Sequence, residues 1–252
     1  MSMQYPATVA SVSENLARLL GRERWHKTHT AGWIGDAIYG VNDGLGAIFG
    51  IIAGVAGYTA SSSTVLISGL FGALASTLSM GAGAWLATKS ETELRQSEIA
   101  HERREILEDP EHEIEELALM YQLKGFDEAE SFQMARRIAQ DTELFVKTMA
   151  QEELGFHDES AGSHWKSAVI GSLSTLVGGL VPLVPFFFMT GTVAMVAAAI
   201  VSIAAHFAVG AAKSLVTARS WWASGIEMTL AGVIVGVVAY GLGILGTMLV
   251  HV

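Results

Sequence analysis

The stretch WIGDAIYGVNDGLGAIFGIIAGVAGY, residues 33–58, decides the class of this protein. It contains no lysine or arginine, and it exceeds the roughly 20 apolar residues that a helix needs to cross a bilayer. The same property extends on both sides, since no basic residue occurs from Thr28 to Thr88. We therefore expect a transmembrane helix over Trp33–Tyr58.

The chain holds further apolar stretches of the same kind. Val65–Ala87 predicts a second span, and Ala168–Ala212 is long enough for two more, with Pro182 and Pro185 marking their join. Ile226–Val250 predicts the last. Only 16% of the residues are charged, and the mean hydropathy is +0.41. These features predict an all-α membrane protein with five transmembrane helices.

The positions of the basic residues predict the orientation. With five spans, segments 1–32, 88–166 and 213–223 share one side of the membrane and contain all 15 lysines and arginines. Because cytoplasmic loops carry an excess of basic residues, we expect these segments to be cytoplasmic. The expected domains are a cytoplasmic N-terminal segment (1–32), transmembrane helices 1–2 (33–88), a cytoplasmic helical domain (89–166) and transmembrane helices 3–5 (167–252).

The sequence of the long polar insert between spans 2 and 3 predicts three helices. The first, Lys89–Glu108, continues out of the second span without a break signal. The second, 109–124, opens on an Asp-Pro pair and ends before Gly125, and the third, 127–154, ends before Gly155. An acidic N-cap, proline in the first turn and glycine after the last turn are typical helix boundaries.

Three carboxylates lie within the apolar stretches, where an ionisable group is costly and therefore a functional candidate. Asp43 is flanked by glycines, and Asp36 lies two turns earlier on the same face. Two acids on one face indicate a cation or proton path, although Asp36 fits a wet interface equally well. For Glu227 a position at the interface is the better interpretation. Met80, in the second span, offers a soft thioether, which becomes a candidate metal ligand only if Asp43 is its partner.

The insert carries a second acidic pattern. Between Glu91 and Glu159 there are 20 acids against seven basic residues. Acids and one methionine recur at helical spacing (Glu98, Glu102, Glu105; Glu113, Glu116; Met149, Glu153). Such like charges destabilise a helix unless arginines or divalent cations compensate them. A solvated acidic face is the alternative to a site for Fe²⁺, Mn²⁺, Co²⁺ or Zn²⁺. His101 and His112 lie beside these acids and could contribute to a site, but neither has ligand-like spacing to another histidine.

Several functions are excluded or not expected. The absence of cysteine excludes thiolate metal sites and cysteine nucleophiles. No Gly-Lys-Ser/Thr phosphate loop is present, which argues against ATP-driven transport. No catalytic constellation can be assembled, so we expect no enzyme, no prosthetic group and no nucleic-acid partner. The run Ser11–Leu20 lacks the apolar core of a cleavable signal peptide.

The chain resembles the vacuolar iron transporter family over about residues 30–250. The stretches that carry the resemblance are DAIYGVNDGL (36–45), LSMGAG (78–83), ERRE (102–105), EIEE (113–116) and MAQEELG (149–155). The sequence of these stretches is most similar to the transporter half of bacterial membrane-bound ferritin proteins. Only about thirty residues precede the first span, without a Glu-x-x-His pair, so we expect no ferritin-like domain.

The resemblance implies a homodimer that exports Fe²⁺ from the cytoplasm in exchange for protons. It implies that Asp43 and Met80, with Asp36 nearer the cytoplasm, line the translocation path. It also implies a cytoplasmic metal site formed by Glu102, Glu105, Glu113, Glu116, Met149 and Glu153. The chain departs from many relatives at two positions, with Ala84 in place of a glutamate and Ala150 in place of a second methionine.

We therefore expect a proton-coupled exporter of divalent transition metal, with Fe²⁺ as the substrate and Mn²⁺, Co²⁺ or Zn²⁺ as possible ones. Its partners would be metal ions, protons, membrane lipid and a second copy of the chain. We expect a multi-pass location in a bacterial cytoplasmic (inner) membrane, with the C-terminus on the far side from the insert. The alternative is a membrane-anchored metal sensor or store that does not transport.

Overall fold

The computed structural model describes residues 31–156, 163–217 and 219–250, and all regular elements among these residues are helices. They form two compact units, the bundle unit (1–80 with 169–252) and the insert unit (81–168). In chain order the elements are α2 (Ala31–Tyr58), α3 (Ser62–Glu108), α4 (Pro110–Leu123), α5 (Glu128–Ile138), α6 (Thr142–Glu152), α7 (His164–Leu180), the 3-10 helix η2 (Val181–Phe187), α8 (Gly191–Thr217) and α9 (Trp221–Val250). The expected N-terminal segment 1–32 lies almost wholly outside the described residues.

Five of these segments are long and apolar enough to cross a membrane, which confirms the expected number of spans. They are α2, α3, α7 together with η2, α8 and α9. In hydrocarbon a backbone must satisfy its own hydrogen bonds, and an uninterrupted helix does so within one segment. The apolar stretches therefore adopt helices whatever their individual residue preferences.

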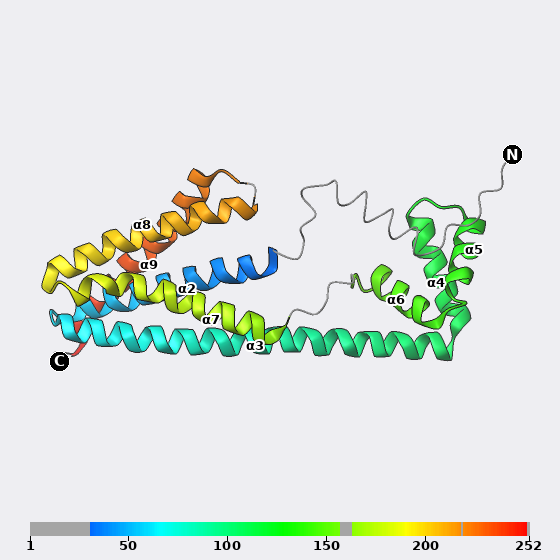
Figure 1. The fold of residues 1–252 in the computed structure, drawn as a ribbon, viewed down its shortest axis with the longest axis horizontal. Coiled ribbons are helices and arrows are strands. Elements are labelled where there is room, and N and C mark those ends of the chain that lie inside the picture. The colour runs from blue at the N-terminus through cyan, green and yellow to red at the C-terminus, as the bar shows by residue number, and fades with distance from the viewer. Residues whose placement is uncertain (1–30, 157–162, 218, 251–252) are drawn as a thin grey trace. The chain divides into compact units, whose positions relative to one another are not determined.

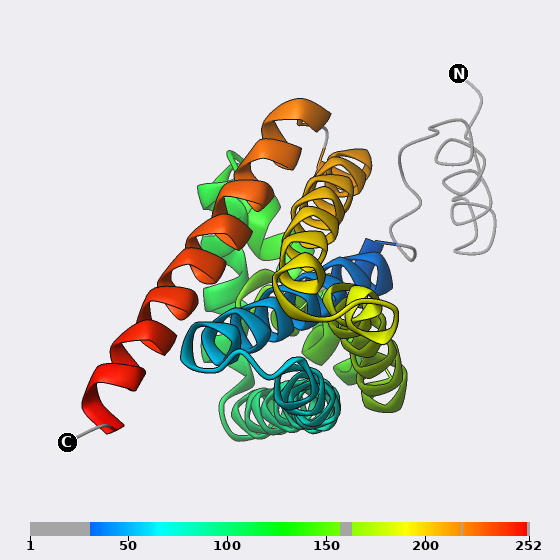
Figure 2. The ribbon, with the colours of Figure 1, turned by 90° about the vertical axis from the view of Figure 1, so that its left-hand side faces the viewer.

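Helix α2 occupies the middle of the bundle unit, with α3, α7, α8 and α9 around it (Figures 1 and 2). Ile48 and Ile52 of α2 are fully buried against Leu183 of η2 and Ala194 of α8. On another side, Gly44 lies so close to the Thr175 carbonyl of α7 that an added Cβ would clash with it. The absence of a side chain at Gly44 therefore lets two backbones meet, as small residues do in membrane helices.

Glycines spaced four residues apart in α2 and α9 pack against other helices of the same chain. A Cβ at Gly50 would meet Val235 at 3.0 Å, and one at Gly54 would meet the Ala239 carbonyl at 3.3 Å. Gly236 of α9 in turn receives the ring of Phe49. Ordinary packing between helices of one chain accounts for this spacing.

The join between the third and fourth spans differs from the sequence expectation. Pro182 and Pro185 do not separate the spans, because the chain continues through both as the 3-10 helix η2. The turn comes later, where Gly191 has φ +64° and its N–H donates to the Ser62 hydroxyl at 2.6 Å. Proline removes a backbone donor without requiring a reversal, so the helix tightens into 3-10 geometry instead of ending.

Helix α3 has 47 residues and runs without interruption from the second span into the insert unit, as expected. At 1.5 Å per residue it is roughly 70 Å long, more than twice the roughly 30 Å of bilayer hydrocarbon. Its apolar half ends near Thr88, and its polar half begins at Lys89. The polar half therefore lies outside the membrane-spanning segment.

The second insert helix begins and ends as expected, whereas the expected third helix is broken. Asp109 caps α4 by accepting from the His112 N–H at 3.3 Å, and the chain turns at Gly125, where φ is +98°. The single helix expected over 127–154 is instead α5 and α6, separated at 139–141. Asp141 accepts from the N–H of Glu143 at 3.0 Å, and this capping bond starts a new helix.

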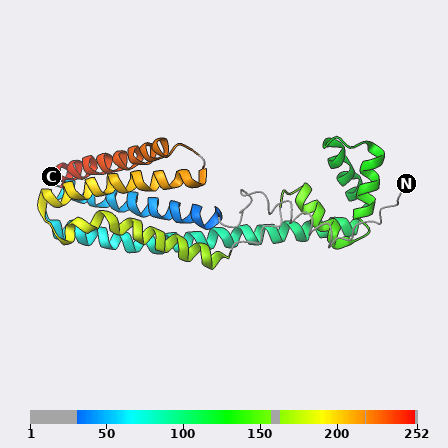
Figure 3. The same cartoon turned by 45° about the horizontal axis from the view of Figure 1, so that its top comes forward.

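The insert unit has its own apolar core. Ile106 of α3, Leu117 of α4, Ala135 of α5 and Phe145 of α6 are buried in one cluster. Figure 3 shows α4, α5 and α6 packed as a group. Two ion pairs tie α6 to its neighbours, Arg103 to Glu143 and Lys124 to Glu152. This core holds the acidic residues of three helices at fixed positions.

Candidate metal sites

The insert unit gathers most of the acids expected at a metal site. α3 supplies Glu102 and Glu105, α4 supplies Glu113 and Glu116, and Glu153 is the C-cap residue of α6. The electrostatic coupling between these groups reaches across all three helices. We call these five glutamates the insert cluster.

Glu102 is the least solvated member of the insert cluster. Its side chain belongs to a residue only 3% exposed, and its Oε1 has no hydrogen-bond partner among the described residues. Burial, then a hydrogen bond with Glu153, then the charges of neighbouring glutamates raise the pKa of Glu102 to about 8. An isolated buried carboxylate is unfavourable, so this group holds a proton near neutral pH unless a cation takes its place.

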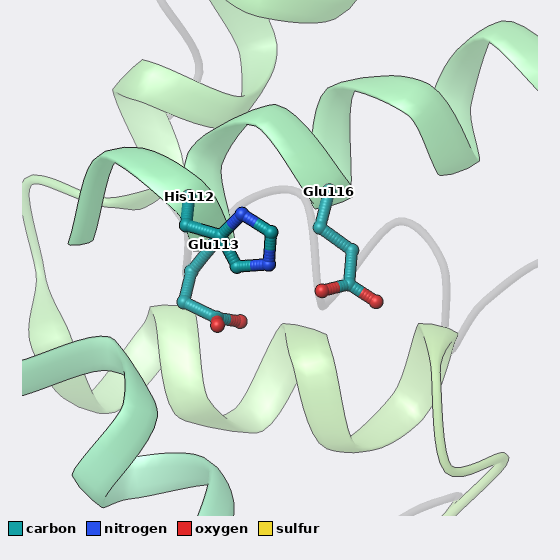
Figure 4. A group of neighbouring side chains, drawn as sticks. All are labelled: His112, Glu113 and Glu116. Atoms are coloured by element: carbon teal, nitrogen blue, oxygen red, sulfur yellow. The ribbon is translucent and has the colours of Figure 1, made fainter. Parts of the chain in front are cut away.

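Glu113 extends the cluster toward water. It is 5% exposed, and its pKa is raised by burial, by Glu116 and by Glu105, while His112 opposes the shift. The nearest nitrogen or oxygen atoms of His112, Glu113 and Glu116 all lie within 4.8 Å of one another. Figure 4 shows the three side chains pointing to the same side of α4. This spacing suits ligands of a single metal ion, whose bonds to nitrogen and oxygen are near 2 Å.

Sequence reasoning placed His112 beside the acids, where it could contribute, but did not include it among the expected ligands. The signal was present, because His112 and Glu116 are separated by four residues and therefore share a helix face. His101 is used differently, since its Nδ1 lies 2.8 Å from Oε2 of Glu105 and orients that carboxylate.

Met149 lies apart from the solvated side of the cluster. It is fully buried in the apolar core of the insert unit, in the same group as Ile114 and Leu117. Ala150, where the family resemblance implied a second methionine, is also buried. Burial by hydrocarbon explains a methionine at position 149 without a metal, so its role as a ligand stays a prediction.

The bundle unit holds the second candidate site. Asp43 of α2 accepts a hydrogen bond from the Ser76 hydroxyl of α3 at 3.2 Å. Met80 lies one turn beyond Ser76 on the same face of α3 and is partly exposed, as Asp43 is. The hydroxyl of Thr77 is buried without a partner among the residues that the structure describes. Asp36 belongs to α2, but its side chain is outside the described part.

Ser76 and Ala84 lie on α3 on either side of Met80. Ser76 was missed by sequence reasoning, although a serine four residues before Met80 in an apolar span is a detectable signal. Ala84 lies on α3 one turn after Met80, where its carbonyl accepts from the Thr88 hydroxyl at 3.0 Å. Glu227 pairs with Arg219 at 3.0 Å and is exposed, which agrees with its interpretation as an interface acid.

Comparison with known proteins adds independent information. The VIT family model matches residues 34–244. Vacuolar iron transporter 1 of Eucalyptus grandis is 33% identical over 233 residues, which is 91% of this chain and 93% of that protein. Vacuolar iron transporter 1 of Arabidopsis thaliana is 32% identical, covering 85% and 86% of the two chains. The vacuolar iron transporter of Toxoplasma gondii is 31% identical, covering 94% and 82%.

The same relatives correct the expected location. All three are named as vacuolar transporters, so the expectation of a bacterial cytoplasmic (inner) membrane is wrong. The error has a physical reason. The distribution of lysine and arginine indicates which segments stay in the cytoplasm, but it does not indicate which membrane borders that cytoplasm.

The multi-pass character survives this correction, and five spans agree with a transporter. The resemblance in sequence covers most of both units, including α2 and the insert cluster. The chain belongs to the vacuolar iron transporter family.

Proposed function

We propose that this protein exports divalent transition metal, with Fe²⁺ as its main substrate, from the cytoplasm in exchange for protons. The observation that supports the proposal best is Glu102, a buried carboxyl group with an unsatisfied oxygen among other glutamates. A site of this kind binds either protons or a divalent cation, since each neutralises the same clustered charge. Competition of this kind is the chemical requirement for proton-coupled release.

The two candidate sites divide this task. In the proposal the insert cluster captures the metal on the cytoplasmic side, as the distribution of basic residues supports. Asp43 then compensates the charge of the ion within the membrane, where an unpaired cation is very costly. Met80 contributes a soft sulfur, which favours Fe²⁺ and Co²⁺ over harder ions. We place Asp36 on the same path because it lies two helical turns before Asp43 on the same face of α2.

A second copy of the chain completes the proposed path. Asp43 and Met80 are only partly buried within one protomer, so one chain alone does not enclose them. The membrane half of α3 also exposes Phe71 and Leu78 on its surface. We propose a homodimer in which this surface and the exposed part of α2, which includes Tyr39, face the partner.

Metal flux into proteoliposomes tests the function. The full chain is reconstituted, and Fe²⁺ uptake is followed by an internal chelating dye with and without an imposed pH gradient. Export predicts uptake that depends on the gradient and an opposite proton movement of matching time course. Uptake that ignores the gradient would remove the proton coupling and leave a uniporter.

The alternative of a sensor or store makes a different prediction. Such a protein would bind Fe²⁺ at the insert cluster while empty and protein-containing vesicles showed the same flux. The hydrogen-bonded acid within the bundle, Asp43, favours transport, because an anchor has no need for a carboxylate in its spans.

A further inference from the structure

The first turn of α4 places the imidazole of His112 beside Glu113 and Glu116. Glutamates alone would not set a preference among divalent metals. Asp109 caps the turn through the His112 N–H, and Pro110 occupies the first helical position. This start fixes the backbone of residues 110–113. His112 and Glu116 therefore lie one turn apart on the same face, with Glu113 beside them.

The ring of His112 is available for a ligand. It is exposed, and its nitrogens make no hydrogen bond within the described residues. His101 differs, because Glu105 already occupies its Nδ1. The nearest ligand atoms of His112, Glu113 and Glu116 lie within 4.8 Å of one another, close enough for one ion to bind all three.

A separate observation indicates that a cation belongs in this neighbourhood. The Oε1 of Glu102 is buried without a partner in the described part of the chain, and Glu113 is among the charges that act on Glu102. Glu113 thus interacts with the buried side of the cluster and with His112 on the exposed side. A carboxylate has two oxygens, so Glu113 can serve both sides at once.

We propose that His112 joins Glu113 and Glu116 to form the outer subsite of the insert cluster, in which the imidazole selects divalent metals that bind nitrogen ligands before they reach the buried carboxylate of Glu102. Fe²⁺, Co²⁺ and Zn²⁺ bind imidazole well, whereas Mg²⁺ and Ca²⁺ prefer oxygen and Mn²⁺ comes lowest in the affinity order of the series. The inference rests on the proposed capture of metal by the insert cluster. It adds the residue that sets the preference among metals.

Metal binding to the full chain in detergent tests the subsite, with Co²⁺ and Mn²⁺ as probes. Calorimetry gives the affinities, and proton NMR of the Co²⁺ form detects the strongly shifted, exchangeable N–H of a coordinated imidazole. His112→Gln should remove that resonance and weaken Co²⁺ binding by about tenfold, the usual order for a lost ligand-shell group. Mn²⁺ binding should change by less than about twofold, because carboxylates dominate it.

Two matched variants control for nonspecific effects. His164→Gln removes a histidine whose ring packs edge-on against Trp85 at 5.8 Å. Glu115→Gln removes an exposed carboxylate on α4 that is outside the subsite. Both should retain the shifted resonance and the Co²⁺ affinity.

The outcomes separate this inference from the proposed function. A resonance that persists in His112→Gln, or equal losses of Co²⁺ and Mn²⁺ affinity, would overturn the role of His112. Co²⁺ binding by the parent chain without any imidazole resonance would overturn the subsite and leave metal capture by glutamates intact. Absence of Co²⁺ binding to the parent would remove both the subsite and the capture step.

Discussion

The insert unit and the bundle unit handle carboxylates in opposite ways. The insert brings five glutamates together around an apolar core and buries two of them, Glu102 and Glu113, almost completely. The bundle presents Asp43 with a single hydroxyl partner, Ser76. Water and neighbouring protons relieve charge in the insert, whereas hydrocarbon allows no such relief. The difference suggests that a crowded site suits capture and release, and a sparse one suits passage.

Removing the sparse site should have the largest effect. Asp43→Asn keeps the size of the side chain and removes its charge, so the ion loses its compensating anion in the membrane. A loss of about 3 kcal/mol, the lower range for breaking a buried charge pair, corresponds to at least about 100-fold in flux. Fe²⁺ flux into proteoliposomes should therefore fall to background, while Co²⁺ binding by the detergent-solubilised chain remains.

Glu227→Gln is the matched control for that variant. Glu227 is an exposed acid of α9 held by Arg219, so its loss should leave flux unchanged. Parental flux in Asp43→Asn would exclude this carboxylate from the path and remove the contrast between the units.

Neutralising the most buried member of the crowded site should have the next largest effect. Glu102→Gln preserves the volume and removes a buried acid that interacts with Glu105, Glu113 and Glu153, so metal affinity should fall by roughly 10–100-fold, as for groups in a ligand shell. Calorimetry of the full chain with Co²⁺ measures the change. Glu108→Gln, which removes an exposed acid of the same helix, should bind as the parent does. Equal effects of both variants would mean that only the overall charge matters.

The raised pKa of Glu102 predicts how pH acts on the metal-free insert unit. The folded state keeps the proton up to about pH 8, while an unfolded glutamate loses it near its ordinary pKa of 4.5. Between these values the folded state binds more protons than the unfolded state, so stability falls as pH rises from about 5 to 8. Hydrogen exchange at the amides of Leu117 and Phe145, corrected for intrinsic rates, should show more frequent opening at the higher pH.

Glu102→Gln provides the control, because a group that does not titrate contributes no slope. The variant should show a shallower dependence of corrected exchange over the same pH range. An identical slope in parent and variant would assign the effect to other groups.

The smallest expected effect concerns the soft donor of the bundle. Met80→Leu keeps the volume and removes the sulfur, so Fe²⁺ and Co²⁺ flux should fall a few-fold relative to Mn²⁺ flux. Competition between the metals in one vesicle preparation measures this ratio. Met195→Leu, a substitution at a methionine packed against the bundle core, should leave the ratio unchanged. A uniform loss for all three metals in Met80→Leu would indicate a packing effect.

Some helix boundaries were predictable from the sequence and others were not. The spans, the cap at Asp109 and the end at Gly125 were predictable because each depends on residues adjacent in the chain. The break at Asp141 was missed because an aspartate within a polar helical pattern gives only a weak signal. The join after η2 was missed because proline allows two outcomes, and packing of Leu183 in the bundle core selects continuation.

The sequence by itself determined that this chain crosses a membrane five times and carries an acidic helical insert. Both follow from local composition, since hydrocarbon accepts only long apolar helices and water accepts clustered charge. Only the tertiary structure decided which acids act together. Burial of Glu102, the orientation of His112 and the bond from Ser76 to Asp43 each depend on how packed helices are placed. Chemistry at these groups depends on solvation, and solvation is set by neighbours distant in the sequence.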